Sequence, residues 1–176
     1  MTSFKADIEG IRKRALEKME EGAVTSAYKA DKEKVISVLN EVLATETVCV
    51  LRYKNHYFMA KGIHASGVEA EFLEHAAQEQ AHADMVAKRI TELGGKADLN
   101  PATLVQRSHA QYGEGDTLEA MIREDLVAER IAVQTYAEII RWLGNDDPTT
   151  RRMIESILAQ EEEHADDMAK LLERVK

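Results

Sequence analysis

The chain has 176 residues, of which 31% are charged and 5% aromatic, and its formal net charge is −9. This length allows one domain with a full hydrophobic core, and the negative charge argues against a protein whose main task is to hold nucleic acid. No apolar stretch is long enough to span a membrane and no signal-peptide pattern opens the chain, so we expect a cytoplasmic protein.

The first 30 residues are predicted to form an N-terminal extension ahead of the main domain, residues 31–176. Apolar residues recur in the extension at helical spacing, at Phe4, Ile8, Ile11, Ala15 and Met19. This spacing predicts a short helix, and residues 22–30 are interpreted as the linker that follows it.

Two long helices are predicted in the first half of residues 31–176. The first runs from about Lys32 to Lys61. The second opens at a capping box formed by Ser66 and Glu69, and Gly94-Gly95 closes it. The connection between these helices is only a few residues long, so we expect them to be antiparallel neighbours.

Two more long helices are predicted in the second half of the chain. Asp116 with Glu119 opens the third helix, and Gly144 ends it. Asp147 followed by Pro148 is an N-cap with proline at the first helical position, and it opens the fourth helix. Each of the four helices is then about 40 Å long at 1.5 Å per residue.

The connection between the second and third helices is much longer, from Gly94 to Gly115. It could reach about 70 Å if extended, which is enough to cross a whole bundle, and a short helix is predicted to start within it at Pro101. Two antiparallel hairpins joined by one long crossover are typical of the ferritin-like four-helix bundle. The predicted fold is therefore all-α, with this bundle and an additional N-terminal helix.

Each predicted bundle helix carries a glutamate on its apolar face near mid-length. These glutamates are Glu46, Glu79, Glu129 and Glu161. Burying one unpaired carboxylate costs several kcal/mol, and four that face one another would cost more. The pattern predicts that cations occupy the centre of the bundle.

The glutamates also belong to a repeated pattern that includes two histidines. Glu46 precedes Glu79-x-x-His82 by 33 residues, and Glu129 precedes Glu161-x-x-His164 by 32. A single Glu-x-x-His on a helix is usually a solvated pair, but two copies with matching upstream glutamates favour a metal site. Four carboxylates balance the charge of two divalent ions, and two neutral imidazoles complete the ligand set.

The remaining histidines and the single cysteine have simpler interpretations. His75 lies on the inner face of the second helix and is interpreted as a satisfied core histidine, with contact to a metal ligand as the alternative. His56, His64 and His109 are predicted to be surface or loop residues. Cys49 excludes an intrachain disulfide and is interpreted as a small core residue.

Mixed carboxylate and imidazole ligation favours iron or manganese over zinc, which prefers fewer ligands. We expect iron, because a carboxylate-rich site stabilises the ferric state. The predicted reaction is the oxidation of two Fe(II) ions by O₂ or H₂O₂. Tyr53 and Tyr136 each lie seven residues beyond a lone glutamate and are candidate electron donors.

The six predicted ligands resemble the ferroxidase centre of bacterioferritins, and the resemblance covers residues 31–174. It implies that Glu79 and Glu161 bridge the two irons. It implies that Glu46 with His82, and Glu129 with His164, are the terminal ligands. Tyr53 matches a tyrosine close to the site in that family, and it is the predicted catalytic residue.

Two differences from bacterioferritins qualify the resemblance. Gln80 stands where they carry their haem-ligating methionine, so no haem is expected. We also expect no fifth helix, because only 12 residues follow His164. In both respects the chain is similar to Dps-like ferritins with a bacterioferritin-type centre, although their paired cysteines are absent.

Three functions are consistent with these patterns. The first is a ferroxidase that stores ferric mineral inside a homo-oligomeric cage, of 12 subunits rather than 24 because the fifth helix of the larger cages is missing. The second is a non-storing di-iron peroxidase or oxidase of the rubrerythrin type, and the third is a helical scaffold without metal. The number of ferric ions held per subunit distinguishes these functions. In each case we expect no nucleic-acid or membrane partner.

Overall fold

The computed structural model describes residues 5–62 and 65–175, and this part of the chain contains helices but no strand. The N-terminal segment contains α1 (Ile8–Glu17) and a single 3₁₀ turn, η1 (Met19–Glu21). The bundle helices are α2 (Lys32–Met59), α3 (Ala65–Glu92), α5 (Leu118–Leu143) and α6 (Pro148–Val175), with the one-turn helix α4 (Leu104–Arg107) between α3 and α5.

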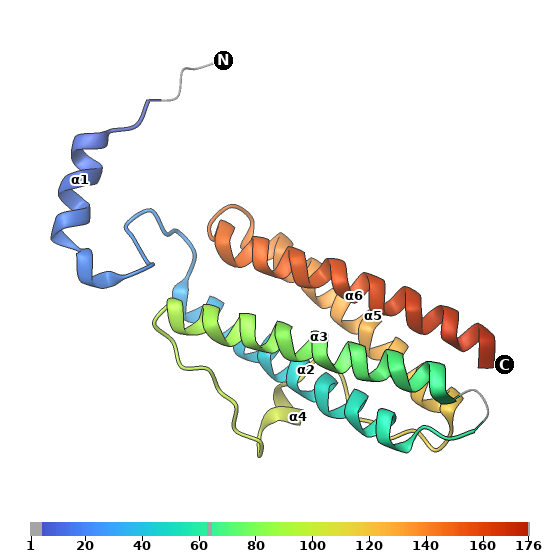
Figure 1. Cartoon of the computed structure of the whole chain (residues 1–176). Coiled ribbons are helices and arrows are strands. Elements are labelled where there is room, and N and C mark those ends of the chain that lie inside the picture. The colour runs from blue at the N-terminus through green and yellow to red at the C-terminus, as the bar shows by residue number, and fades with distance from the viewer. Residues whose placement is uncertain (1–4, 63–64, 176) are drawn as a thin grey trace.

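The four long helices form two hairpins that pack against each other (Figure 1). Helix α2 lies along α3, and α5 lies along α6; the two pairs meet through contacts of α2 with α5 and of α3 with α6. The chain reaches α5 from α3 by a long crossover whose helix α4 packs on α2. The predicted all-α bundle with one long crossover is confirmed.

Most helix ends lie within two residues of their predicted positions. Helix α2 begins at Lys32 as predicted, after the N-cap Asp31, but it ends at Met59 because the backbone becomes extended at Ala60. Helix α3 begins at Ala65. Ser66 therefore lies inside the first turn and is not its N-cap, so the predicted capping box is wrong.

The start of α5 also differs from the prediction, whereas its end and the start of α6 are confirmed. Thr117, and not Asp116, caps α5, because the Thr117 hydroxyl accepts a hydrogen bond from the backbone N–H of Ala120. Gly144 ends α5 with a positive φ of 51°. Asp147 caps α6, since its Oδ1 accepts a hydrogen bond of 2.9 Å from a backbone N–H in the first turn.

Two apolar clusters fill the two ends of the bundle and leave a polar zone at its middle. The larger cluster includes Val35, Leu39, Val86, Ile90, Tyr136, Ile139, Ile154 and Ile157. The second includes Tyr53, Val68, Phe72, Met121, Ile122, Met168 and Leu171. Burial of this apolar surface is the main source of stability, and it places the residues of the polar zone at fixed positions between two packed layers.

The N-terminal helix α1 confirms the predicted short helix over the described part of its stripe, and Phe4 lies outside the described residues. The helix has no buried residue, and it lies away from the bundle in Figure 1. The linker behaves differently, because Val24 and Tyr28 pack against the larger core cluster. The short crossover helix begins at Leu104 rather than Pro101, since residues 101–103 form turns.

Within the described residues, no helix has both the length and the apolarity that a membrane crossing requires.

Candidate metal centre

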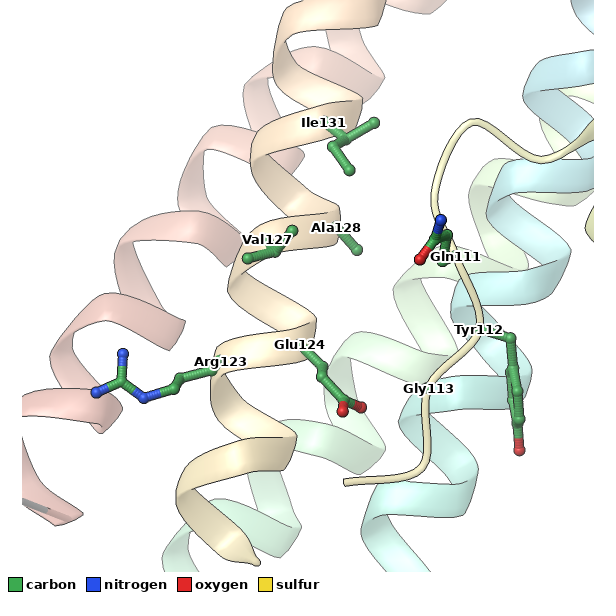
Figure 2. A pocket seen from close by; sticks show the side chains of 8 residues that line it. All are labelled: Gln111, Tyr112, Gly113, Arg123, Glu124, Val127, Ala128 and Ile131. Carbon is green, nitrogen blue, oxygen red and sulfur yellow. The ribbon is translucent and has the colours of Figure 1, made fainter. Parts of the chain in front are cut away.

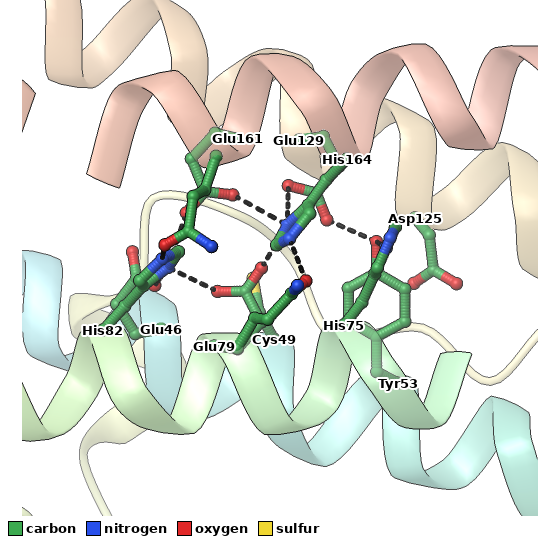
Figure 3. Close-up of polar contacts among 12 residues, drawn as sticks. Glu46, Cys49, Tyr53, His75, Glu79, His82, Asp125, Glu129, Glu161 and His164 are labelled. Atoms are coloured by element: carbon green, nitrogen blue, oxygen red, sulfur yellow. Dashed lines mark hydrogen bonds and ion pairs between the residues drawn. The ribbon is translucent and has the colours of Figure 1, made fainter. Parts of the chain in front are cut away.

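The polar zone at the middle of the bundle contains one glutamate from each long helix. Glu46 lies on α2, Glu79 on α3, Glu129 on α5 and Glu161 on α6, and each is only 1% exposed. The side chains converge between the helices in Figure 3. The structure thus brings together the four carboxylates that helical spacing placed on inward-facing stripes.

Two histidines lie among these carboxylates, and each presents its Nδ1 atom to them. His82 Nδ1 is 3.1 Å from Glu46 Oε2 and 2.9 Å from Glu161 Oε1. His164 Nδ1 is 3.2 Å from Glu79 Oε1 and 3.5 Å from Glu161 Oε2. All six predicted ligand residues therefore lie in one cluster.

The cluster resolves into two overlapping sets of possible ligand atoms, and within each set the atoms lie within 4.8 Å of one another. The first set comprises Glu46, Glu79, His82 and Glu161. The second comprises Glu79, Glu129, Glu161 and His164. Glu79 and Glu161 belong to both sets, so the geometry suits two cations that share two bridging carboxylates.

The hydrogen bonding of the carboxylates fits a cation site. Among the described residues, Glu129 Oε2 and Glu161 Oε1 are buried and accept no hydrogen bond of acceptable geometry. A buried carboxylate oxygen without a partner costs free energy, and a metal ion would remove that cost. Hard oxygen donors with two imidazoles are a ligand set that iron binds well.

The electrostatics of the site also favour bound positive charge. Burial and the neighbouring Glu79 raise the pKa of Glu46 to about 8. Burial and the neighbouring Glu79 and Glu161 also raise the pKa of Glu129 well above its ordinary value. Burial alone lowers the pKa of His164, but Glu161 and Glu79 outweigh it and raise that pKa to about 9. Because a nearby cation lowers the pKa of a carboxyl group, Glu46 and Glu129 ionise more readily when positive charge is bound beside them.

Two buried tyrosines form hydrogen bonds with two of the central glutamates in a nearly symmetric way. The Tyr53 hydroxyl donates a hydrogen bond to Glu129 Oε1, and the Tyr136 hydroxyl donates one to Glu46 Oε1. Both tyrosines are fully buried, and burial raises the pKa of each phenol above its ordinary value. Each tyrosine therefore contacts a carboxylate that belongs to only one of the two sets.

Two glutamines that were not among the predicted site residues complete the surroundings of the histidines. His82 Nε2 lies 2.8 Å from Gln160 Oε1, and His164 Nε2 lies 2.7 Å from Gln78 Oε1. When each Nε2–H donates to an amide oxygen, the Nδ1 lone pair points at the carboxylates. The signal was present in the sequence, because both motifs read Ala-Gln-Glu-x-x-His.

His56 is buried and not at the surface, which corrects the prediction. Its Nδ1 lies 2.8 Å from Asp125 Oδ2, and Arg52 Nε donates to the other oxygen of that carboxylate at 2.7 Å. The burial is possible because Asp125 supplies a charged partner inside the bundle. His109 lies in the crossover as predicted, and His64 is outside the described residues.

Cys49 is buried, as predicted, and burial raises the pKa of its thiol. His75 is also buried, but its contacts extend beyond those of a core residue. Its Nδ1 lies 3.2 Å from the Tyr53 hydroxyl, and its ring stacks on that of His164 with centroids 4.0 Å apart. Burial, with a smaller effect of His164, lowers the pKa of His75 to about 3.

Solved structures with this fold include ferritin-related proteins from several bacteria. A dodecameric thioferritin, the bacterioferritin-related protein of Bacteroides fragilis, superposes with a TM-score of 0.80 at 30% identity, covering 84% of this chain and 89% of that one. Dps from Thermosynechococcus elongatus superposes with a TM-score of 0.77 at 20% identity, covering 80% of this chain and 91% of that one.

Sequence comparison agrees with the structural likeness. The chain is 30% identical over 142 residues to the DNA protection during starvation protein of Pyrococcus furiosus, covering 76% of this chain and 74% of that protein. It is 27% identical over 134 residues to the bacterioferritin of Desulfovibrio desulfuricans, covering 76% and 71%. The ferritin family model, described as a ferritin-like domain, matches residues 36–176. The chain therefore belongs to the ferritin family.

Proposed function

We propose that this protein is a ferroxidase that oxidises two Fe(II) ions per chain with H₂O₂ or O₂ and stores the ferric product inside a homo-oligomeric cage. The observation that carries the proposal is the pair of overlapping ligand sets, which share Glu79 and Glu161. Two Fe(II) ions are the substrates. They give two electrons to one H₂O₂, which takes up two protons and leaves as two waters, or to one O₂, which takes up two protons and leaves as H₂O₂.

In this proposal the six ligands divide into two bridges and two terminal pairs. Glu79 and Glu161 bridge the ions, and the terminal pairs are Glu46 with His82 and Glu129 with His164. The four carboxylates carry a charge of −4, which balances two divalent ions in a site that water enters poorly. Gln78 and Gln160 keep the histidine Nδ1 atoms directed at the ions by accepting the Nε2 protons.

Tyr53 is the proposed catalytic residue beside the ligands. Its hydroxyl donates to Glu129, so it orients a terminal carboxylate and is joined to a proposed metal ligand by one hydrogen bond. Tyr136 has the same relation to Glu46. Either phenol can supply an electron and a proton when fewer than two Fe(II) ions are available for an oxidant.

We expect the protein to bind no haem through the α3 position that Gln80 occupies. The Gln80 amide is exposed and donates a hydrogen bond of 3.0 Å to Asp84 on the same helix. An amide is also a poor iron ligand compared with the thioether of methionine.

Mineral storage requires a closed assembly, because a single bundle encloses no space for it. The Bacteroides fragilis relative is described as dodecameric. On this chain, a groove of about 310 Å³ lies between the crossover and α5, lined by Tyr112, Val127 and Ile131 among others (Figure 2). Val127 is 59% exposed and Trp142 is 49% exposed. These apolar side chains favour contact with further copies of the chain.

We also expect no tight binding to duplex DNA, although two relatives are named for DNA protection. The net charge is −9, and residues 1–34 carry almost equal numbers of basic and acidic side chains. Such a chain releases few counterions on contact with DNA.

Iron loading tests the proposed function against the non-storing alternative. Purified apo-protein is supplied with Fe(II) in portions under air or with H₂O₂, desalted, and assayed for ferric iron per chain. Storage predicts tens of ferric ions per chain or more, whereas about two would indicate a peroxidase or oxidase of the rubrerythrin type. Retention of no iron would contradict both functions.

A further inference from the structure

A second group of possible metal ligands lies beside the centre described above and shares no residue with it. Glu71 and His75 on α3 and Asp167 on α6 offer ligand atoms that all lie within 4.8 Å of one another. The His75 side chain is only 3% exposed, whereas those of Glu71 and Asp167 are 40% and 34% exposed. The group therefore opens to solvent between α3 and α6 and ends at a buried imidazole.

The hydrogen bonds around Tyr53 determine which nitrogen of His75 carries its proton. The Tyr53 hydroxyl has one proton, and it donates this proton to Glu129. Tyr53 therefore accepts a hydrogen bond from His75 Nδ1, 3.2 Å away (Figure 3). In the neutral ring, the Nε2 atom on the opposite side then has a lone pair and no proton.

That lone pair faces two carboxylates. His75 Nε2 lies 3.9 Å from Glu71 Oε2 and 3.9 Å from Asp167 Oδ2, and neither distance allows a hydrogen bond. Three acceptors therefore converge with no proton between them, which is unfavourable without a cation. Lys170 Nζ lies 3.6 Å from Asp167 Oδ1, the other oxygen of that carboxylate, so Oδ2 remains directed toward His75.

We propose that Glu71, His75 and Asp167 bind a third divalent cation, outside the pair held by the four central glutamates. Bonds of about 2.0–2.2 Å from one ion to nitrogen and oxygen bring its ligand atoms to about 3 Å from each other. Small rotations of two half-exposed carboxylates are enough to close the present spacing to that value. A ligand set of one imidazole and two carboxylates suits Fe(II), Mn(II) or Co(II), with water in the remaining positions.

The third cation is coupled to the central pair through His75. The His75 ring stacks on that of His164, and its Nδ1 reaches Glu129 through Tyr53. A cation on Nε2 makes the Nδ1–H a stronger donor to Tyr53 and thereby affects a terminal ligand of the central pair. The choice of Fe(II) among these ions as the natural occupant rests on the proposed function, but the existence of the site does not.

The test counts Co(II) ions bound to the assembled protein by anaerobic equilibrium dialysis. Three proteins are compared: the unmodified chain, Glu71→Gln/Asp167→Asn, and the matched control Glu74→Gln/Asp166→Asn. The control makes the same charge change on the same two helices, but its side chains do not belong to the ligand group. We expect about three tightly bound ions per chain in the unmodified and control proteins and about two in the site variant.

Crystals soaked in Co(II) give the location independently of the count. An anomalous peak beside His75 Nε2 in the unmodified protein, lost in Glu71→Gln/Asp167→Asn, is the expected result. Equal Co(II) counts in all three proteins, or no peak at this position, would overturn the proposal. If the peak is present but the protein does not oxidise Fe(II), the proposed function fails while the third site stands.

Discussion

Each histidine of the central cluster is oriented by a glutamine of the other hairpin, which contacts its Nε2 atom. Gln160 on α6 accepts from His82 on α3, and Gln78 on α3 accepts from His164 on α6. The arrangement is reciprocal across the bundle, so each Gln-Glu-x-x-His segment contains two proposed ligands and also contacts the histidine of the other segment. Such supporting contacts fix the tautomer of a histidine ligand and hold its ring in position.

Replacing Gln160 with leucine should therefore weaken metal binding without removing a ligand. His82 loses the acceptor for its Nε2 proton, so the ring rotates more freely and its Nδ1 atom is less well directed. We expect a loss of about 10- to 100-fold in metal affinity, measured by anaerobic Co(II) dialysis. Gln80→Leu is the matched control because Gln80 is exposed on α3. Equal affinities in both variants would contradict the supporting role of Gln160.

At the residue scale, helical periodicity was enough to bring the six predicted ligands together. A spacing of three residues places Glu and His on one face, and the same pattern occurs twice. The buried pair of His56 and Asp125 could not be predicted in this way. The two residues lie 69 positions apart in sequence, on different helices, and no periodic signal links one position to the other.

At the element scale, the N-terminus of α6 joins three parts of the chain. The Asp147 carboxylate accepts hydrogen bonds from the backbone N–H and the hydroxyl of Thr150. Arg89 of α3 donates to it at 3.0 Å, and Tyr28 of the linker donates to it at 3.0 Å. One buried carboxylate therefore caps α6 and attaches both α3 and the linker to it.

Asp147→Ala should lower the free energy of unfolding by about 2–4 kcal/mol, because it removes a helix cap and takes the buried carboxylate partner from Arg89. Burial alone raises the pKa of Asp147, but hydrogen bonds from Thr150 and the charge of Arg89 lower it overall. A lowered carboxyl pKa stabilises the fold above the unfolded value of about 3.9 and stops doing so as pH falls through the folded value.

The stability difference between wild type and Asp147→Ala should therefore be full at neutral pH and shrink below about pH 4. Urea unfolding at several pH values measures it. Asp146→Ala is the control, since Asp146 is exposed and adjacent in sequence. A difference that stays constant down to pH 2, or an equal loss in the control, would be inconsistent with this account of the cap.

The presence and the order of the helices could be predicted from the sequence, but two of the predicted N-caps were wrong. Asp116 and Thr117 are adjacent residues that both favour the N-cap position. The choice between them depends on which side chain reaches the free amide of the first turn, and Thr117 does. In the same way, serine is a residue type that favours the N-cap, but Ser66 lies inside α3, which begins one residue earlier.

At the scale of the whole molecule, the described residues form a four-helix bundle, and helix α1 lies apart from it. The spacing of apolar residues in α1 predicts a helix with an apolar face. Ile11 and Leu16 of this helix are nevertheless 47% and 78% exposed. The sequence could predict this helix but not its position, because the core clusters contain no residue of it. The division at residue 30 stays a prediction, and Tyr28 already belongs with the bundle.

The proposed cage predicts a native mass far above that of one chain. Twelve chains of 19.7 kDa give about 240 kDa, and twenty-four give about 470 kDa. We expect the smaller value by light scattering coupled to size-exclusion chromatography at micromolar concentration. A monomer or dimer would contradict mineral storage and leave the non-storing di-iron enzyme as the remaining function.

The central claim is that Glu79 and Glu161 are shared by two Fe(II) ions whose oxidation is the function of the protein. Stopped-flow measurement of Fe(II) oxidation, at two Fe(II) ions per chain, tests it most directly. The variants are Glu79→Ala and Glu161→Ala, with Glu162→Ala as a control on the exposed side of α6. Both bridge variants should remain folded, because each loses a buried charge.

Loss of either bridge should reduce the fast phase of oxidation by about 100-fold or more, since each glutamate contacts both ions in the proposed centre. The Glu162→Ala control should oxidise Fe(II) at the wild-type rate. Wild-type rates in both Glu79→Ala and Glu161→Ala would contradict the assignment of this cluster as the ferroxidase centre.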